Sequence, residues 1–108
     1  MKTGDIILVP FPFAELTHRK VRPCVVICET KDKFKDVVVS AISSVVPAEL
    51  NENEILLPPD TINNLRASSV IKVDRIVTVK SDDIITALGK LNLTQLKIFV
   101  EKFRNLAR

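Results

Sequence analysis

The stretches DIILVPFP (residues 5–12) and VRPCVVIC (residues 21–28) decide how this chain folds. Residues 5–9 are apolar after Asp5 and rich in β-branched side chains, which favours a strand, and the prolines that follow end it because they remove two backbone donors. Residues 21–28 are almost continuously apolar, as in a strand that is buried on both faces. The sequence therefore predicts two strands of one hairpin, joined by a long loop over residues 13–20.

Further strands are expected at short intervals after the first two. Residues 37–43 have strong β propensity, residues 45–53 lack a regular pattern, and residues 54–57 form an apolar-rich run that two prolines end. Residues 67–79 are long enough for one or two more strands. Five or six short strands in so short a chain predict a small, strongly bent sheet or β-barrel. The predicted fold class is thus mainly β with a helical part.

Two helical segments are expected toward the C-terminus. Ser81 is placed to cap a short helical turn over residues 82–85, and Gly89 would end that turn. A longer helix is predicted to start near Thr94, because apolar residues recur every three or four positions and form one stripe. The stripe consists of Leu96, Phe99, Val100, Phe103, Leu106 and Ala107. We expect this C-terminal helix to lie on the barrel or on a partner subunit.

Length and composition narrow the class of protein. With 108 residues, the chain is expected to form a single domain over residues 1–108. It has no apolar run of membrane-spanning length and no signal-peptide pattern at its start, so we expect a cytoplasmic protein without a membrane segment. Gly4 and Gly89 are its only glycines, which excludes the glycine-rich loops that hold ATP or NAD. No cofactor is therefore predicted.

The cysteines and the histidine do not form a metal-binding pattern. On one extended strand Cys24 and Cys28 would lie on the same face about 13 Å apart, which is too far for a disulfide. His18 is the only histidine, and its spacing from the cysteines matches no common zinc site. Acidic residues likewise do not cluster at a recognisable spacing. We expect both cysteines to be reduced, in the core or an interface, and no metal to be bound.

Positive charge is concentrated in one part of the sequence. The formal net charge is +3 and the isoelectric point is near 9.0. Basic side chains far outnumber acidic ones between residues 17 and 35, and they are His18, Arg19, Lys20, Arg22, Lys31, Lys33 and Lys35. Such a patch is compatible with a polyanionic partner and equally typical of a solvated surface. Phe34, among these charges, is placed either to stack on an unpaired base or to pack on the barrel rim.

Arg22 and two serines are the candidates for chemistry. Arg22 lies near the start of an apolar strand, where its side chain is either solvated or directed at an anion. Its planar, charged guanidinium group suits a phosphate. Ser43 and Ser44 point to opposite sides at a strand end, so only one of them can face the same region as Arg22. Serines at such positions are more often turn formers than catalysts. No pattern marks a serine nucleophile, so a hydrolase triad is not predicted.

Segments along the whole chain resemble the MazF/PemK family of type II toxin–antitoxin toxins. The most specific are the opening KTGDIILVPFPF (residues 2–13) and the Arg-Pro strand RPCVVI (residues 22–27). AISS (residues 41–44) resembles the segment that bears the family's catalytic threonine or serine. SVIKVDRIVTV (residues 69–79) and LGKL (residues 88–91) resemble the family's late strand and the turn into its terminal helix.

The resemblance implies an SH3-like, CcdB/PemK-type small β-barrel that forms a homodimer and is blocked by a cognate antitoxin. It implies a sequence-preferring endoribonuclease that cuts single-stranded RNA, including mRNA. Arg22 and Ser43 occupy the matching catalytic positions, where the two side chains flank the scissile phosphate and the ribose 2′-OH attacks without a metal, leaving a 2′,3′-cyclic phosphate or its opened product. Arginine holds its proton at neutral pH, so another group or solvent must act as the base, and Glu15 and His18 are the candidates from the loop. The substrate-binding candidates are Glu15, His18, Arg19, Lys20, Ser44 and Phe34.

The loop over residues 14–20 departs from the family pattern. AELTHRK is shorter and free of glycine, where many members have a Gly-Ser-Glu-Gln-like stretch. We expect this difference to change which bases are recognised. Two alternatives keep the barrel without catalysis: a module that binds nucleic acid or, like CcdB, DNA gyrase, and an inactive paralogue. The intact Arg-Pro and serine segments count against the gyrase alternative.

Overall fold

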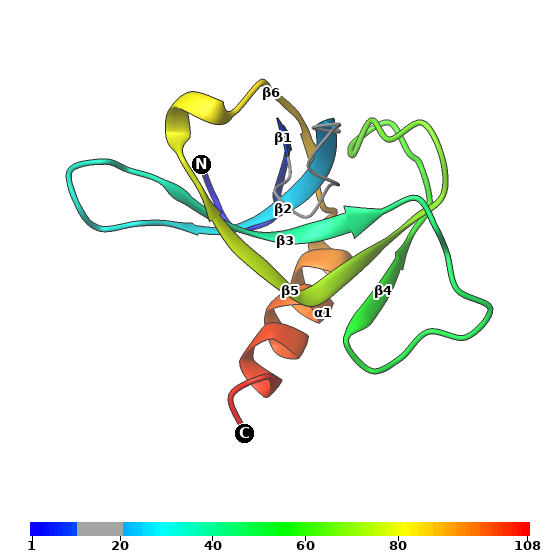
Figure 1. Cartoon of the computed structure of the whole chain (residues 1–108). Coiled ribbons are helices and arrows are strands. Elements are labelled where there is room, and N and C mark those ends of the chain that lie inside the picture. The colour runs from blue at the N-terminus through cyan, green and yellow to red at the C-terminus, as the bar shows by residue number, and fades with distance from the viewer. Residues whose placement is uncertain (11–20) are drawn as a thin grey trace.

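Antiparallel strand pairing organises the chain. The computed structural model describes residues 1–10 and 21–108, and within these residues six strands form one curled sheet with the order β4-β5-β3-β2-β1-β6 (Figure 1). The elements are β1 (Asp5–Pro10), β2 (Val21–Glu29), β3 (Val37–Ser43), β4 (Glu54–Leu57), β5 (Ser69–Val79), the 3₁₀ turn η1 (Ser81–Asp83), β6 (Thr86–Lys90) and α1 (Leu93–Asn105). The predicted fold class, mainly β with a C-terminal helix, is confirmed, and residues 67–79 contain one long strand rather than two.

Strand β2 is buried on both faces, as its apolar sequence predicts. Val25 and Ile27 belong to a core cluster on one face of the sheet, which α1 covers through Phe99. Cys24 and Val26 belong to a second cluster on the opposite face. Strand β2 therefore separates the two apolar cores, and its open end carries the candidate arginine.

The two edges of the sheet are joined by the segment between β4 and β5. The backbone N–H of Lys90 in β6 donates to the carbonyl of Ile62 (3.2 Å), and the side-chain amide of Asn64 donates to the carbonyl of Leu88 (2.6 Å). A Cβ atom on Gly89 would collide with the Ile62 carbonyl, so this close approach requires glycine. The prediction that Gly89 ends a helical turn was therefore wrong, since the glycine lies within β6.

The helical turn after β5 is shorter than predicted. Ser81 is its first residue rather than its cap, and the Ser81 hydroxyl donates to the carbonyl of Phe34 (3.3 Å). Ile84 is already extended, and the N–H of Ile85 donates to the carbonyl of Leu8 in β1 (2.9 Å). The sequence pattern favoured a continuing turn, but pairing with β1 draws residues 84 and 85 into an extended path.

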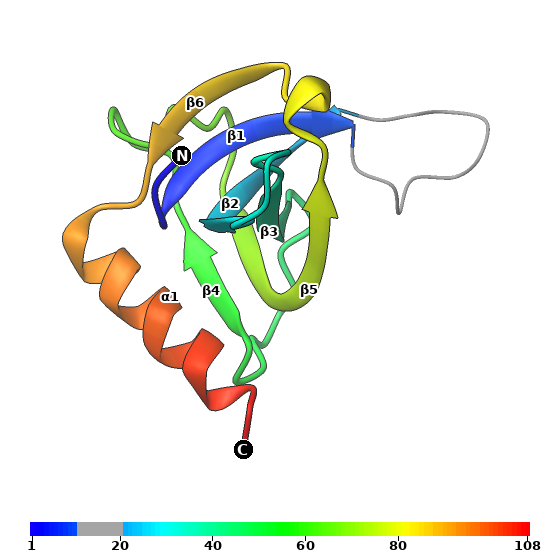
Figure 2. The same ribbon diagram turned by 90° about the vertical axis from the view of Figure 1, so that its left-hand side faces the viewer.

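The terminal helix begins one residue before its predicted start. Asn92 caps it, because the Asn92 side chain accepts from the N–H of Gln95 (2.8 Å) while the Gln95 side chain accepts from the N–H of Asn92 (3.1 Å). Phe99 is buried and most of the predicted stripe packs around it, namely Leu96, Val100, Phe103 and Leu106. Ala107 lies beyond the helix and is exposed, in contrast to the prediction. Figure 2 shows α1 lying across the outside of the curled sheet.

A bulge separates the two cysteines. The register of β2 against β3 shifts between Val26 and Cys28, so that Cys24 is buried and Cys28 is exposed. Cys28 is therefore not in the core, because the bulge breaks the alternation of the strand, and its expected alternative, a position in an interface, stays a prediction. Burial raises the pKa of the Cys24 thiol to about 12, which keeps that thiol protonated at neutral pH.

Candidate functional site

Strand register brings Arg22 and Ser43 together. Arg22 pairs with Val9 of β1, and on the other side of β2 the pair Cys24–Ala41 joins β2 to β3. The paired residues of β2 and β3 end at Cys24 and Ala41, and this antiparallel register, continued by two residues, sets Arg22 opposite Ser43. Residues that lie directly opposite share one face of a sheet. The structure thus places both predicted catalytic residues on the same face, at the open ends of neighbouring strands.

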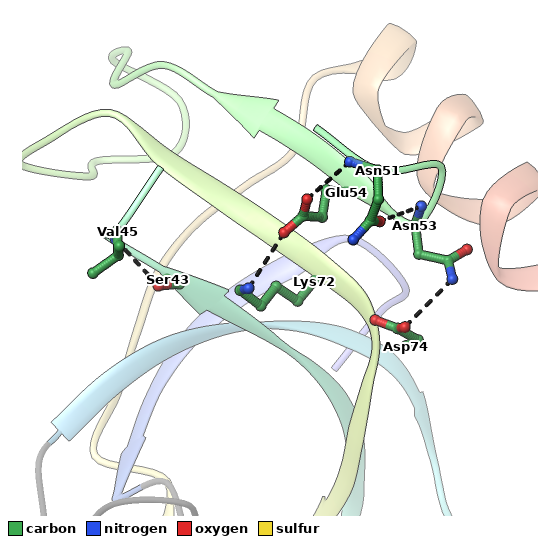
Figure 3. Close-up of polar contacts among 7 residues, drawn as sticks. All are labelled: Ser43, Val45, Asn51, Asn53, Glu54, Lys72 and Asp74. Atoms are coloured by element: carbon green, nitrogen blue, oxygen red, sulfur yellow. Dashed lines mark hydrogen bonds and ion pairs between the residues drawn. The ribbon is translucent and has the colours of Figure 1, made fainter. Parts of the chain in front are cut away.

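The Ser43 hydroxyl is oriented by the chain that follows it. Its oxygen accepts a hydrogen bond from the backbone N–H of Val45 (3.1 Å), as Figure 3 shows, which leaves the hydroxyl hydrogen to be donated elsewhere. Ser44 lies in the bend after β3 and is exposed. Of the two serines, Ser43 is therefore the one on the same face as Arg22, and its hydroxyl hydrogen can be donated to a bound phosphate.

Arg22 is half-buried and has no acidic partner in the described part of the chain. The ion pairs among residues 1–10 and 21–108 join the N-terminus to Glu29 and Lys72 to Glu54. An arginine that is partly withdrawn from water without a carboxylate partner is a strong binder of anions, because a phosphate can take up its planar fork of donors.

A second polar pair, which the sequence analysis did not single out, lies beside Ser43. The β3–β5 ladder shifts between Ser40 and Ala41, and the shift puts Lys72 of β5 opposite Ala41. Lys72 in turn lies opposite Glu54 of β4, and the Lys72 ammonium donates to Glu54 Oε2 (3.2 Å). In Figure 3 the Lys72 side chain runs from β5 toward the strand that carries Ser43. The available signal was a lysine inside an otherwise apolar strand.

Glu54 is buried and charged. The backbone N–H of Asn51 donates to Glu54 Oε1 (2.9 Å) and is the main reason why the pKa of this carboxyl lies below its usual value. Burial opposes this effect, and the hydrogen bond and charge of Lys72 support it. The carboxylate side chain is 6% exposed and the lysine side chain 30% exposed. Glu54 is thus a fixed anchor, and Lys72 is the member of the pair that reaches solvent.

We expect Glu54 to stabilise the fold at neutral pH and to lose this effect in acid. Because its folded-state pKa is lowered from 4.5, the contribution is present above that value and disappears as the pH falls through the folded-state pKa. Thermal denaturation of the wild type and Glu54→Gln between about pH 7 and pH 3 tests this. The melting temperature of the wild type should exceed that of the variant at neutral pH and converge with it in acid. A difference that stays constant with pH would contradict the expectation.

The predicted positive patch does not form one surface in the described residues. Lys31, Lys33 and Lys35 lie in the loop between β2 and β3, at the far end of β2 from Arg22, which is about 23 Å along the strand at ~3.3 Å per residue. Phe34 in the same loop is 61% exposed and carries the Lys33 ammonium 5.3 Å from its ring centre. It does not pack on the rim, and the structure does not bring it to Arg22 and Ser43 within one chain.

Four candidates lie outside the described residues: Glu15, His18, Arg19 and Lys20. Their roles as base or substrate-binding residues stay predictions. In residues 1–10 and 21–108, no three side chains of histidine, cysteine, aspartate or glutamate gather in a way that suits a metal ion. The described helices include none that is long and apolar enough to cross a membrane.

Comparison with known proteins agrees with this architecture. The family model described as "PemK-like, MazF-like toxin of type II toxin-antitoxin system" matches residues 2–106. The match extends over almost the whole chain, so the fold is that of a small toxin of this class. The chain belongs to the PemK/MazF-like toxin family. None of the curated proteins compared with the chain matches it.

Several solved structures from mycobacteria are similar to this chain. The Mycobacterium tuberculosis toxin MazF-mt6 superposes with a TM-score of 0.68 at 21% identity, over 94% of this chain and 93% of the toxin. An endoribonuclease in complex with its cognate antitoxin gives 0.72 at 11% identity, over 97% of this chain and 92% of the neighbour. Another mycobacterial endoribonuclease gives 0.70 at 12% identity, covering 97% and 88%. At these identities the likeness shows a shared fold.

Proposed function

We propose that this protein is the toxin of a type II toxin–antitoxin pair and acts as an endoribonuclease on single-stranded RNA, including mRNA, without a metal ion. The observation that supports the proposal is the β2–β3 register, which, continued by two residues beyond the Cys24–Ala41 pair, sets Arg22 opposite Ser43 on one face of the sheet. Family membership and the endoribonuclease neighbours support the reaction class. The neighbour in complex with its antitoxin supports an antitoxin as a partner.

The pair suits cleavage by the ribose 2′-OH. In this reaction the 2′-oxygen forms a bond to phosphorus, the bond from phosphorus to the 5′-oxygen breaks, and a 2′,3′-cyclic phosphate remains. Arg22 neutralises the charge that develops on the phosphoryl oxygens and donates a hydrogen bond to the leaving 5′-oxygen, which takes its proton from water. Ser43 donates its free hydroxyl hydrogen to the phosphate. The proton of the 2′-OH passes to a base, for which Glu15 and His18 are the candidates.

A homodimer completes this proposal. The resemblance of the chain to its family implies two copies, with RNA bound in a groove along their interface. Arg22 and Ser43 are only half-buried at their strand ends, so an RNA strand could reach both side chains. The cognate antitoxin would then inhibit by covering the same groove.

Cleavage of a long, defined single-stranded RNA by the purified protein in EDTA tests the proposed function. We expect discrete cuts at a short motif, 5′-hydroxyl ends on the downstream fragments, and a loss of about 10- to 150-fold in rate for Ser43→Ala, as for one hydrogen bond to a charged group. Ser44→Ala is the matched control, since its hydroxyl lies in the exposed bend. A folded wild-type protein that cuts no RNA would contradict the proposal and favour a binding module.

A further inference from the structure

The Lys72–Glu54 pair lies on the same face of the sheet as Arg22 and Ser43. One row of cross-strand neighbours runs through Cys24, Ala41, Lys72 and Glu54. Arg22 and Ser43 lie two residues away along β2 and β3, and positions two apart in a strand share a face. Lys72 is thus the diagonal neighbour of Ser43, with Cα atoms about 7–8 Å apart.

The anchoring of Lys72 leaves it free to bind an anion. Its ammonium group has three N–H donors, and Glu54 Oε2 accepts one of them. The backbone N–H of Asn51 donates a hydrogen bond to Glu54, whose side chain is almost fully buried. The Glu54 carboxylate therefore fixes the position of the Lys72 ammonium from the buried side of the pair. Here the Lys72 side chain is 30% exposed while that of Glu54 is 6% exposed, so the cation is the partner that reaches solvent.

The spacing of the cations fits a nucleic-acid backbone. Arg22 and Lys72 lie on strands that are separated by β3, which is about 10 Å across the sheet at ~4.8 Å per strand. Both side chains are long, and Ser43 lies between them. One phosphate held by Arg22 and Ser43 and a neighbouring phosphate held by Lys72 would place the RNA strand across β2, β3 and β5.

We propose that Lys72, held in place by Glu54, binds a backbone phosphate next to the scissile one. This inference rests on the proposed RNA substrate. The charge of Lys72 is present before and during the reaction, so it binds substrate and transition state equally. We therefore expect a higher KM with little change in kcat when the charge is removed.

The test compares Lys72→Met with Lys97→Met, which removes the same charge from the exposed surface of α1. A fluorescent oligonucleotide containing the mapped cut site serves for cleavage, and its all-2′-deoxy version, which cannot be cut, serves for binding. For Lys72→Met we expect KM and Kd to rise about 5- to 10-fold at low salt. The slope of log Kd against log salt should decrease by about 0.7, the value for one phosphate on a single strand. Lys97→Met should leave both values unchanged.

Two further variants separate a phosphate contact from a purely structural role. Lys72→Arg keeps the charge and should restore the salt slope, while Glu54→Gln should leave the slope intact and raise Kd only modestly. An unchanged salt slope in Lys72→Met, together with a lower melting temperature, would overturn the inference. If the wild type binds the uncut oligonucleotide with a Lys72-dependent slope but cuts no RNA, then the nuclease proposal fails and this inference survives. If it cuts RNA with a KM and salt slope that do not depend on Lys72, only this inference fails.

Discussion

Arg22→Ala is expected to reduce RNA cleavage by about 10³-fold or more while the fold is retained. Removing one preorganised donor from a site of this kind costs about 10²–10³-fold, and arginine supplies a full charge in addition to its donors. Arg22 is half-buried and forms no ion pair with the described residues, so its truncation leaves no buried charge without a partner. Single-turnover cleavage and the melting temperature, measured on the same preparation, give both quantities.

Two matched variants make the Arg22 result specific. Arg75→Ala removes the same side chain from an exposed position on β5 and should cut RNA at the wild-type rate. Arg22→Lys keeps the charge but loses the planar fork, so it should recover only part of the activity. Cleavage by Arg22→Ala at a rate close to the wild type would show that the chemistry lies elsewhere in the chain.

Phe99→Ala is expected to destabilise the protein by about 3–5 kcal/mol, the usual range for a buried phenylalanine. Phe99 is 1% exposed and is the largest of the fully buried side chains in the described residues. It packs on the core cluster that includes Ile6, Val25 and Leu57, and so links α1 to strands from both halves of the sheet. Urea denaturation monitored by circular dichroism, at matched protein concentrations, measures the loss.

Leu93→Ala is the control for the Phe99 variant. Leu93 begins the same helix but is 82% exposed, so its truncation should change the free energy of unfolding by less than about 0.5 kcal/mol. If Phe99→Ala were as stable as Leu93→Ala, then α1 would contribute little to the stability of the sheet, and the assignment of its inner face would be wrong.

Most of the fold could be predicted from local patterns. The strands over residues 37–43 and 54–57 have the predicted bounds, because β-branched runs and following prolines act within a few residues of each other. The helix stripe gave the inner face of α1 correctly, since a period of 3.6 is a property of the sequence alone. The missed detail was Asn92, whose capping role depends on Gln95 three residues later.

The errors arose where distant segments meet. Gly89 looked like a helix end, but the carbonyl of Ile62 is what requires a glycine there. Residues 84 and 85 looked helical, but the open edge of β1 provides backbone partners that a short turn cannot match. Cys28 was expected on the same face of β2 as Cys24, but a bulge in β2 leaves it exposed. In each case a backbone contact between residues far apart in sequence outweighed the local preference.

By itself the sequence determined the strand-rich architecture, the family, and Arg22 and Ser43 as the residues to test, because apolar periodicity, prolines and short motifs are local properties. Only the tertiary structure decided which of the other charged residues join them. The ladder shift in β3 brings Lys72 and Glu54 beside Ser43, while strand β2 carries the lysines of the β2–β3 loop away from Arg22. Register and bulges set these distances, and they follow from how whole strands pair, which no short stretch of this sequence specifies.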